Sequence, residues 1–206
     1  VFMLDRAGLT GPDGPTHHGA FDIGYLRLFP NLAVLAPGDE HDLSAMLDWA
    51  LAHNGPVAIR YPKAVAERVP GVRCPVELGR AEQNVLGGDG LIVACGTLVG
   101  AALEAVATLR DEGLCVGVVN ARFVKPLDPR IAEWIEAAPW TVTVEENALP
   151  TGFGGAVLEA VNDAGVHAGP IVRLGLPDRF VEHGERGELL ADLGLDAAGI
   201  AATCRR

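Results

Sequence analysis

The residues best suited to chemistry lie in one glycine-rich loop near the start of the chain. Arg6 carries a planar guanidinium that can hold a phosphate or carboxylate, Asp13 can accept a hydrogen bond from a substrate hydroxyl, and His17 can exchange a proton near neutral pH. The loop, residues 5–19, follows an apolar strand expected at 1–4, and long loops inside compact domains are usually functional. The spacing alone also fits an ordinary surface loop, so both interpretations stay open on these residues.

A second cationic group, Arg60 and Lys63, closes the apolar strand expected at 57–61. Ligands of open parallel sheets bind beyond the carboxyl ends of the strands, so these charges could reach the same sheet edge as the loop. Either residue alone fits the solvated end of a strand. Cations at the ends of two strands favour a pocket for a phosphate.

Other polar residues carry weaker signals. His17 and His18 are adjacent, but neighbouring side chains in an extended loop point apart and no third ligand lies near in sequence, so no metal site is expected. Glu145 and Glu146 could do acid-base work, although a structural or interface role is favoured. The stretch Arg122–Asp128 is interpreted as structural, with Asp128 capping the helix that follows.

The composition excludes several classes of function. The chain has 206 residues, of which 49% are hydrophobic and 21% charged, which is typical of a globular protein. The net charge of -11 disfavours nucleic acid as a ligand. No apolar run is long enough to cross a membrane, no export signal opens the sequence, and the four cysteines form no close pairs. We therefore expect a cytoplasmic protein that binds neither nucleic acid nor membrane.

Strands and helices alternate along most of the chain. In the first part, a helix at 22–28, a strand at 32–36, a helix with Gly38 as its cap, and the strand at 57–61 predict a parallel sheet. Residues 64–79 lose this pattern and are expected to form a linker. In the second part, strands are expected at 91–95, 116–120, 141–144 and 171–174, and helices at 99–111, after 128, and at 153–164, 185–193 and after 196. The fold class is therefore α/β.

The sequence also resembles a known family. The segments DRAGLTGPDGPTHHGAFDIGYLR, LAPGDEHDL and IRYPK resemble the later pyrimidine-domain part of 1-deoxy-D-xylulose 5-phosphate synthases, and RFVKPLD, VTVEENALPTGFGGAV, GLPDRFVEHG and ELLADLGLDAAGI resemble their C-terminal domain. The resemblance covers essentially the whole chain. It implies a partial transketolase-like pyrimidine-binding domain at 1–63, a linker at 64–79, and a transketolase C-terminal-like domain with a mostly parallel sheet at 80–206.

The resemblance implies a transferase that condenses pyruvate with D-glyceraldehyde 3-phosphate and releases carbon dioxide. Its other product, 1-deoxy-D-xylulose 5-phosphate, would be a precursor of isoprenoids, thiamine and pyridoxal. Thiamine diphosphate, held with Mg²⁺, supplies the carbanion chemistry. Arg6 would hold the phosphate of D-glyceraldehyde 3-phosphate, which is the acceptor substrate. Asp13 would bond a hydroxyl of this acceptor, and His17 would take part in proton transfer. Lys63 stands where the family commonly has arginine, which keeps the charge but loses the bidentate fork.

In the family, the main diphosphate and magnesium ligands and the activating glutamate would precede Val1. The resemblance therefore implies the C-terminal portion of a longer homodimeric enzyme, inactive without its N-terminal domain. Two alternatives stay open: a β-type chain of another transketolase-like 2-oxo-acid enzyme that works with a separate partner chain, and a non-catalytic dimerisation module.

Overall fold

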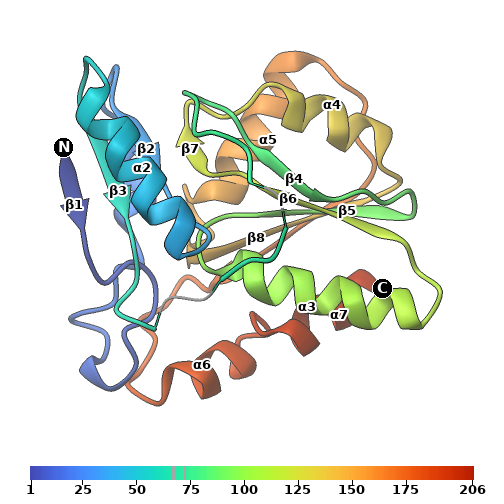
Figure 1. Ribbon diagram of the computed structural model, residues 1–206. Helices are drawn as coiled ribbons and strands as arrows, with labels where there is room; N and C mark the ends of the chain where they lie inside the picture. Colours follow the sequence, from blue (N-terminus) through green and yellow to red (C-terminus); the bar gives the residue numbers. More distant parts are fainter. Residues whose placement is uncertain (66–67, 72) are drawn as a thin grey trace.

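The computed structural model describes residues 1–65, 68–71 and 73–206, and Figure 1 shows a smaller sheet on the left and a larger sheet on the right. Within these residues the smaller sheet has four strands in the order β1-β3-β2-β7. Their bounds are β1 (Phe2–Leu4), β2 (Ala33–Leu35), β3 (Val57–Arg60) and β7 (Phe123–Lys125). The first three run parallel, as the sequence predicts, and β7 is antiparallel to β2.

The larger sheet has five strands in the described ranges, in the order β4-β6-β5-β8-β9. Their bounds are β4 (Glu82–Val85), β5 (Gly90–Ala94), β6 (Val116–Asn120), β8 (Thr141–Ala148) and β9 (Ile171–Leu176). β5, β6, β8 and β9 are parallel, and β4 is antiparallel to β6 at the edge. The prediction of a mostly parallel sheet is confirmed.

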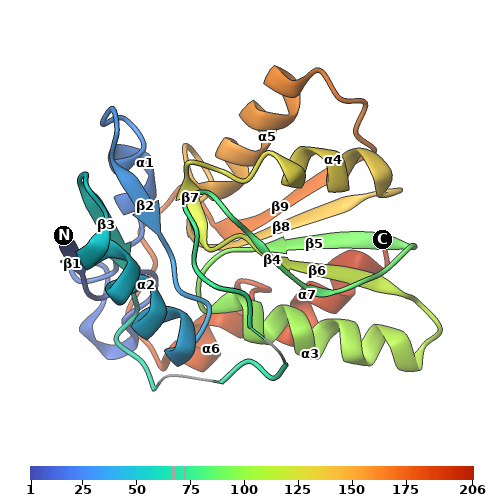
Figure 2. The ribbon, with the colours of Figure 1, turned by 45° about the horizontal axis from the view of Figure 1, so that its top comes forward.

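Helices cover both sheets, as Figures 1 and 2 show. On the larger sheet, α3 (Leu98–Asp111) and α7 (Ala197–Cys204) lie on one face, and α4 (Arg130–Ala137) and α5 (Phe153–Ala164) lie on the other. The long helix α2 (Glu40–Ala52) packs on the smaller sheet. The shorter elements are the 3-10 turn η1 (Gly11–Asp13), α1 (Asp22–Leu26) and α6 (Arg186–Asp192).

Three local expectations need correction. Gly38 does not cap α2, because Asp39 does so by accepting the backbone N–H of Asp42 at 2.9 Å. The strand expected to end at residue 144 continues to Ala148. Its polar side chains Glu145, Glu146 and Asn147 are tolerated in the interior because each is hydrogen-bonded there. The sequence analysis also missed β4 and β7, short strands whose pairing depends on residues far away in the chain.

The two parts of the chain share one interior. Strand β7, from the second part, completes the first sheet, and a common apolar cluster joins Ile23 and Val34 to Val93 and Phe153. The expected linker lies between the parts and is partly described, because residues 66, 67 and 72 lie outside the described residues. The division into 1–63, 64–79 and 80–206 remains a prediction.

Candidate active site

The loop that carries Arg6, Asp13 and His17 begins at the carboxyl end of β1. Its start is aligned with β3, because the N–H of Tyr61 donates to Leu4 O at 3.0 Å and the N–H of Ala7 donates to Tyr61 O at 2.9 Å. The loop then closes on itself through Gly19, whose N–H donates to Arg6 O at 2.9 Å. A side chain at Gly19 would overlap that backbone, so the closure requires glycine.

Arg6, Asp13 and Lys63 come together at this edge. Lys63 Nζ donates to Asp13 Oδ2 at 2.6 Å, and Arg6 Nε lies 3.9 Å from the same oxygen. Their side chains keep exposed fractions of 41% for Arg6, 29% for Asp13 and 55% for Lys63. Two cations therefore flank one carboxylate at the surface, with donors left to hold an anion.

The charges around Asp13 favour its ionised form. The hydrogen bond from Lys63 lowers the pKa of Asp13 below its ordinary value, the positive charges of Lys63, His17 and Arg6 add to this effect, and partial desolvation opposes it. Asp13 is consequently a hydrogen-bond acceptor at neutral pH. It suits a substrate hydroxyl.

Arg6 also has an unusual backbone. Its φ of 60° lies in the left-handed region, which costs a non-glycine residue about 1 kcal/mol or more. Its buried Nε atom has no hydrogen-bond partner among the described residues. Such backbone strain is found preferentially at functional positions.

The two histidines have different surroundings. His17 is exposed, and its Nδ1 lies 3.0 Å from Thr16 Oγ1, so it faces solvent beside the charged group. His18 turns inward, where its Nδ1 accepts the N–H of Thr10 at 3.0 Å. His17 is therefore available to a ligand, whereas His18 holds the loop.

Arg60 does not join the exposed group. Its side chain is only 3% exposed, and its Nε donates to Asp22 Oδ2 at 2.7 Å. The same guanidinium donates to the backbone oxygens of Gly19 (3.4 Å) and Glu146 (3.2 Å). Arg60 thus supports the loop from beneath, and only Lys63 of the second cationic group reaches the surface.

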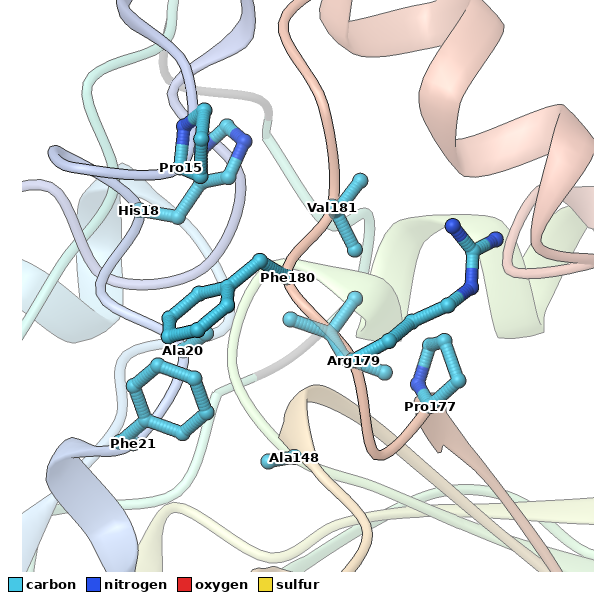
Figure 3. A pocket seen from close by; sticks show the side chains of 10 residues that line it. Pro15, His18, Ala20, Phe21, Ala148, Pro177, Arg179, Phe180 and Val181 are labelled. Carbon is cyan, nitrogen blue, oxygen red and sulfur yellow. The ribbon is translucent and has the colours of Figure 1, made fainter.

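Residues 177–181, from the second part of the chain, form a wall beside the loop that sequence reasoning missed. Figure 3 shows Phe180 facing Phe21, and their rings meet edge to face with centroids 5.9 Å apart. Together with His18, Ala20 and Val181 they line a shallow apolar pocket. No local sequence signal indicates this wall, because it depends on the packing of the two parts.

The described ranges 1–65, 68–71 and 73–206 contain no cluster of three or more His, Cys, Asp or Glu that could hold a metal ion. Within the part of the chain that the structure describes, no helix is both long and apolar enough to span a membrane.

Comparison with known families agrees with this fold. A model described as the transketolase, pyrimidine binding domain matches residues 1–67, and one described as the transketolase, C-terminal domain matches residues 79–200. The chain therefore belongs to the transketolase family, and the expected α/β fold class is confirmed.

The curated relatives are more specific. The chain is 50% identical over 209 residues to 1-deoxy-D-xylulose-5-phosphate synthase 2 of Geobacter sulfurreducens, a match that covers 100% of the chain and 33% of that protein. It is also 50% identical to 1-deoxy-D-xylulose-5-phosphate synthase of Rhodopirellula baltica, covering 100% of the chain and 32% of that protein. The chain thus spans about one third of the length of these relatives.

Two solved structures share the architecture. A split-gene transketolase in an inactive β4 tetramer superposes with a TM-score of 0.86 at 29% identity, covering 98% of this chain and 64% of that chain. A transketolase variant from Pichia stipitis superposes with a TM-score of 0.72 at 21% identity, covering 98% of this chain and 29% of that chain. The latter likeness concerns the fold alone.

Proposed function

We propose that this chain forms the acceptor-side portion of a thiamine-diphosphate-dependent transferase that makes 1-deoxy-D-xylulose 5-phosphate and carbon dioxide from pyruvate and D-glyceraldehyde 3-phosphate. The observation that carries the proposal is the group of Arg6, Asp13 and Lys63 at one sheet edge, joined by contacts of 2.6 and 3.9 Å. The relatives named for this activity match the whole chain.

Each side chain has a distinct role in this proposal. Arg6 and Lys63 hold the acceptor phosphate, because both are cationic and partly exposed. Asp13 accepts a hydrogen bond from an acceptor hydroxyl, which orients the aldehyde. His17 moves a proton at the rim of the loop, where its ring faces solvent. Arg60 has a supporting role, since its guanidinium is occupied by Asp22.

Thiamine diphosphate, when bound, supplies the carbanion chemistry that removes carbon dioxide from pyruvate. The residues that bind its diphosphate and Mg²⁺ are proposed to lie in polypeptide that this chain does not include. We further propose that the enzyme is a cytoplasmic homodimer, with residues 1–63 belonging to the pyrimidine-binding domain and residues 80–206 to the C-terminal domain. These assignments rest on the family.

The test uses the complete natural reading frame, with carbon dioxide release and product formation followed at varied acceptor and pyruvate concentrations. Arg6→Met should lower kcat/KM for glyceraldehyde 3-phosphate by about 10- to 100-fold, since a hydrogen bond to a charged group is worth roughly 1.5–3 kcal/mol. Arg110→Met is the matched control, because Arg110 is an exposed cation in the last turn of α3. Equal kinetics of the two variants would contradict the proposed phosphate site.

A second candidate is a β-type chain that works with a separate partner chain. It is favoured by the split-gene transketolase, which superposes on 98% of this chain with a TM-score of 0.86. The two candidates differ in polypeptide length. An immunoblot of the native host against the loop-bearing segment should show a polypeptide about three times as long as this chain if our first proposal holds, judged by the one-third coverage of the relatives.

A further inference from the structure

One buried carboxylate of the larger sheet holds the loop that carries the acceptor residues. Glu146 lies in β8, and its side chain is 4% exposed. Its Oε1 atom accepts the N–H of Leu9 at 2.7 Å. Its Oε2 atom accepts Nη2 of Arg186 at 2.5 Å and Oγ1 of Thr97 at 3.2 Å. Both carboxylate oxygens are therefore engaged, one by the loop and the other by Arg186 and Thr97.

The alternation of side chains along β8 explains why this residue reaches the loop. Successive residues of a strand point to opposite faces. Glu145 accepts the N–H groups of Phe153 and Gly154 at 2.6 and 2.8 Å and so begins helix α5. Glu146 points to the other face, toward Leu9. Of the two adjacent glutamates, Glu145 therefore binds the start of α5 and Glu146 binds the loop.

The loop is shaped to receive this carboxylate. Gly8 has a φ of 75°, and a Cβ atom at this position would overlap the side chain of Glu146. A left-handed glycine directly before Leu9 lets the backbone approach the carboxylate closely. The position of Glu146 and the turn at Gly8 therefore depend on each other.

Arg186 links the same carboxylate to the turn that ends at Asp13. The backbone just before it touches η1, because the N–H of Gly184 donates to Gly11 O at 3.4 Å. A Cβ atom at Gly14 would lie 3.3 Å from Cβ of His183. Residues 183–186 therefore run along the turn, and the ion pair between Arg186 and Glu146 fixes them there.

We infer that Glu146, oriented by Arg186 and Thr97, is a positioning residue for the acceptor site. It holds the loop at Leu9 so that Arg6 and Asp13 meet Lys63 at one place. Glu146 itself does not touch the acceptor region, since its oxygens are occupied by Leu9, Arg186 and Thr97. The substrate named in this inference rests on the proposed function, but the hold on the loop does not.

The test compares Glu146→Gln with Glu104→Gln in the complete reading frame. Glutamine keeps the size of the side chain and loses the charge that pairs with Arg186, whereas Glu104 is an exposed acidic residue of helix α3. We expect Glu146→Gln to raise KM for glyceraldehyde 3-phosphate about tenfold or more, while KM for pyruvate stays within about twofold. Glu104→Gln should match the wild type.

A purely structural role would give a different pattern. Loss of folded protein would lower kcat for both substrates together and leave both KM values unchanged, and that result would overturn the inference. Arg186→Met and the double variant sharpen the test. If the pair acts as a unit, the double variant should be no worse than the poorer single variant.

Amide hydrogen exchange keeps this inference separate from the proposed function. Glu146→Gln should speed exchange in peptides covering residues 9–17 and leave α3 unchanged, whether or not the wild type accepts glyceraldehyde 3-phosphate. An inactive wild type would reject the proposed function, and exchange alone would then decide the role of Glu146. Unchanged exchange at Leu9 in the Glu146→Gln variant would overturn the positioning role of Glu146.

Discussion

Two groups of charged side chains in this protein both combine basic residues with carboxylates and have opposite surroundings. At the surface, Arg6 and Lys63 flank Asp13 and remain partly exposed. In the interior, two arginines interlock with three carboxylates between α2 and the larger sheet: Arg73, Arg122, Asp39, Asp42 and Glu82. The interior group joins the two parts of the chain, whereas the surface group is the proposed substrate site.

The two groups differ in how many partners within the protein each charged side chain has. Asp42, which is fully buried, lies 2.7 Å from Arg73 Nη2 and 2.9 Å from Arg122 Nη2, and it also accepts Nδ2 of Asn120 at 2.7 Å. Asp13 has its closest cation in Lys63, whose own side chain is 55% exposed. Burial obliges every charge to be paired, whereas exposure lets a cation exchange its partner for a ligand. Substitutions in the two groups should therefore have different consequences.

The largest effect is expected from Arg122→Met. Arg122 is fully buried beside Asp42 and Glu82, and removing one partner of a buried pair typically costs about 3–5 kcal/mol. Urea unfolding followed by circular dichroism should show this loss. Arg205→Met, which breaks an exposed pair with Glu112, should leave the urea midpoint nearly unchanged. Equal urea midpoints for the two variants would contradict the expected difference in stability between losing a buried ion pair and losing an exposed one.

The next effect concerns a buried carboxylate outside both groups. Burial raises the pKa of Glu145 from 4.5 to about 7, against the opposing hydrogen bonds from Gly154 and Phe153. Between pH 4.5 and about 7 the folded state therefore binds more protons at Glu145 than the unfolded state does. The free energy of unfolding should fall as pH rises through this window.

This pH effect is measured against Glu145→Gln, which does not titrate. The stability of the wild type relative to this variant should drop by up to about 3 kcal/mol across the window. Urea titrations at closely spaced pH values test it. A constant difference between the two proteins would show that folding does not raise the pKa of Glu145.

A smaller effect is expected from Lys63→Met. It should raise KM for glyceraldehyde 3-phosphate about tenfold, because one charged hydrogen bond to the phosphate is lost. The urea midpoint should not change, since the side chain is mostly exposed. Lys63→Arg serves as the companion variant, and its bidentate fork should restore or tighten acceptor binding. A loss of stability without a change in KM would show that Lys63 stabilises the fold and does not bind the acceptor phosphate.

The smallest effect is a titration shift. In Lys63→Met the pKa of Asp13 should rise toward its ordinary value, because the hydrogen bond from Lys63 is the main cause of its lowering. NMR titration of a protein labelled at the aspartate carboxyl carbon would follow the change. An unchanged Asp13 pKa would contradict the contact.

Local sequence patterns predicted much of the fold and the approach of Arg6 and Lys63 at one sheet edge. Strand-helix alternation predicted strands such as β6 and helices such as α5, because apolar periodicity reflects burial along one element. The positions of Arg6 and Lys63 after parallel strands also indicated that they would approach one another. β7 was not predictable in the same way, since its three residues pair with a strand nearly ninety positions earlier.

The sequence by itself predicted most of the elements, the α/β class and a loop after the first strand that carries Arg6, Asp13 and His17. Only the tertiary structure decided that Arg60 is buried on Asp22 while Lys63, three residues later, reaches Asp13. It also decided that Glu146 holds Leu9. The physical reason is that solvation and long-range partners set the role of a charged side chain, and both depend on how the two parts of the chain pack.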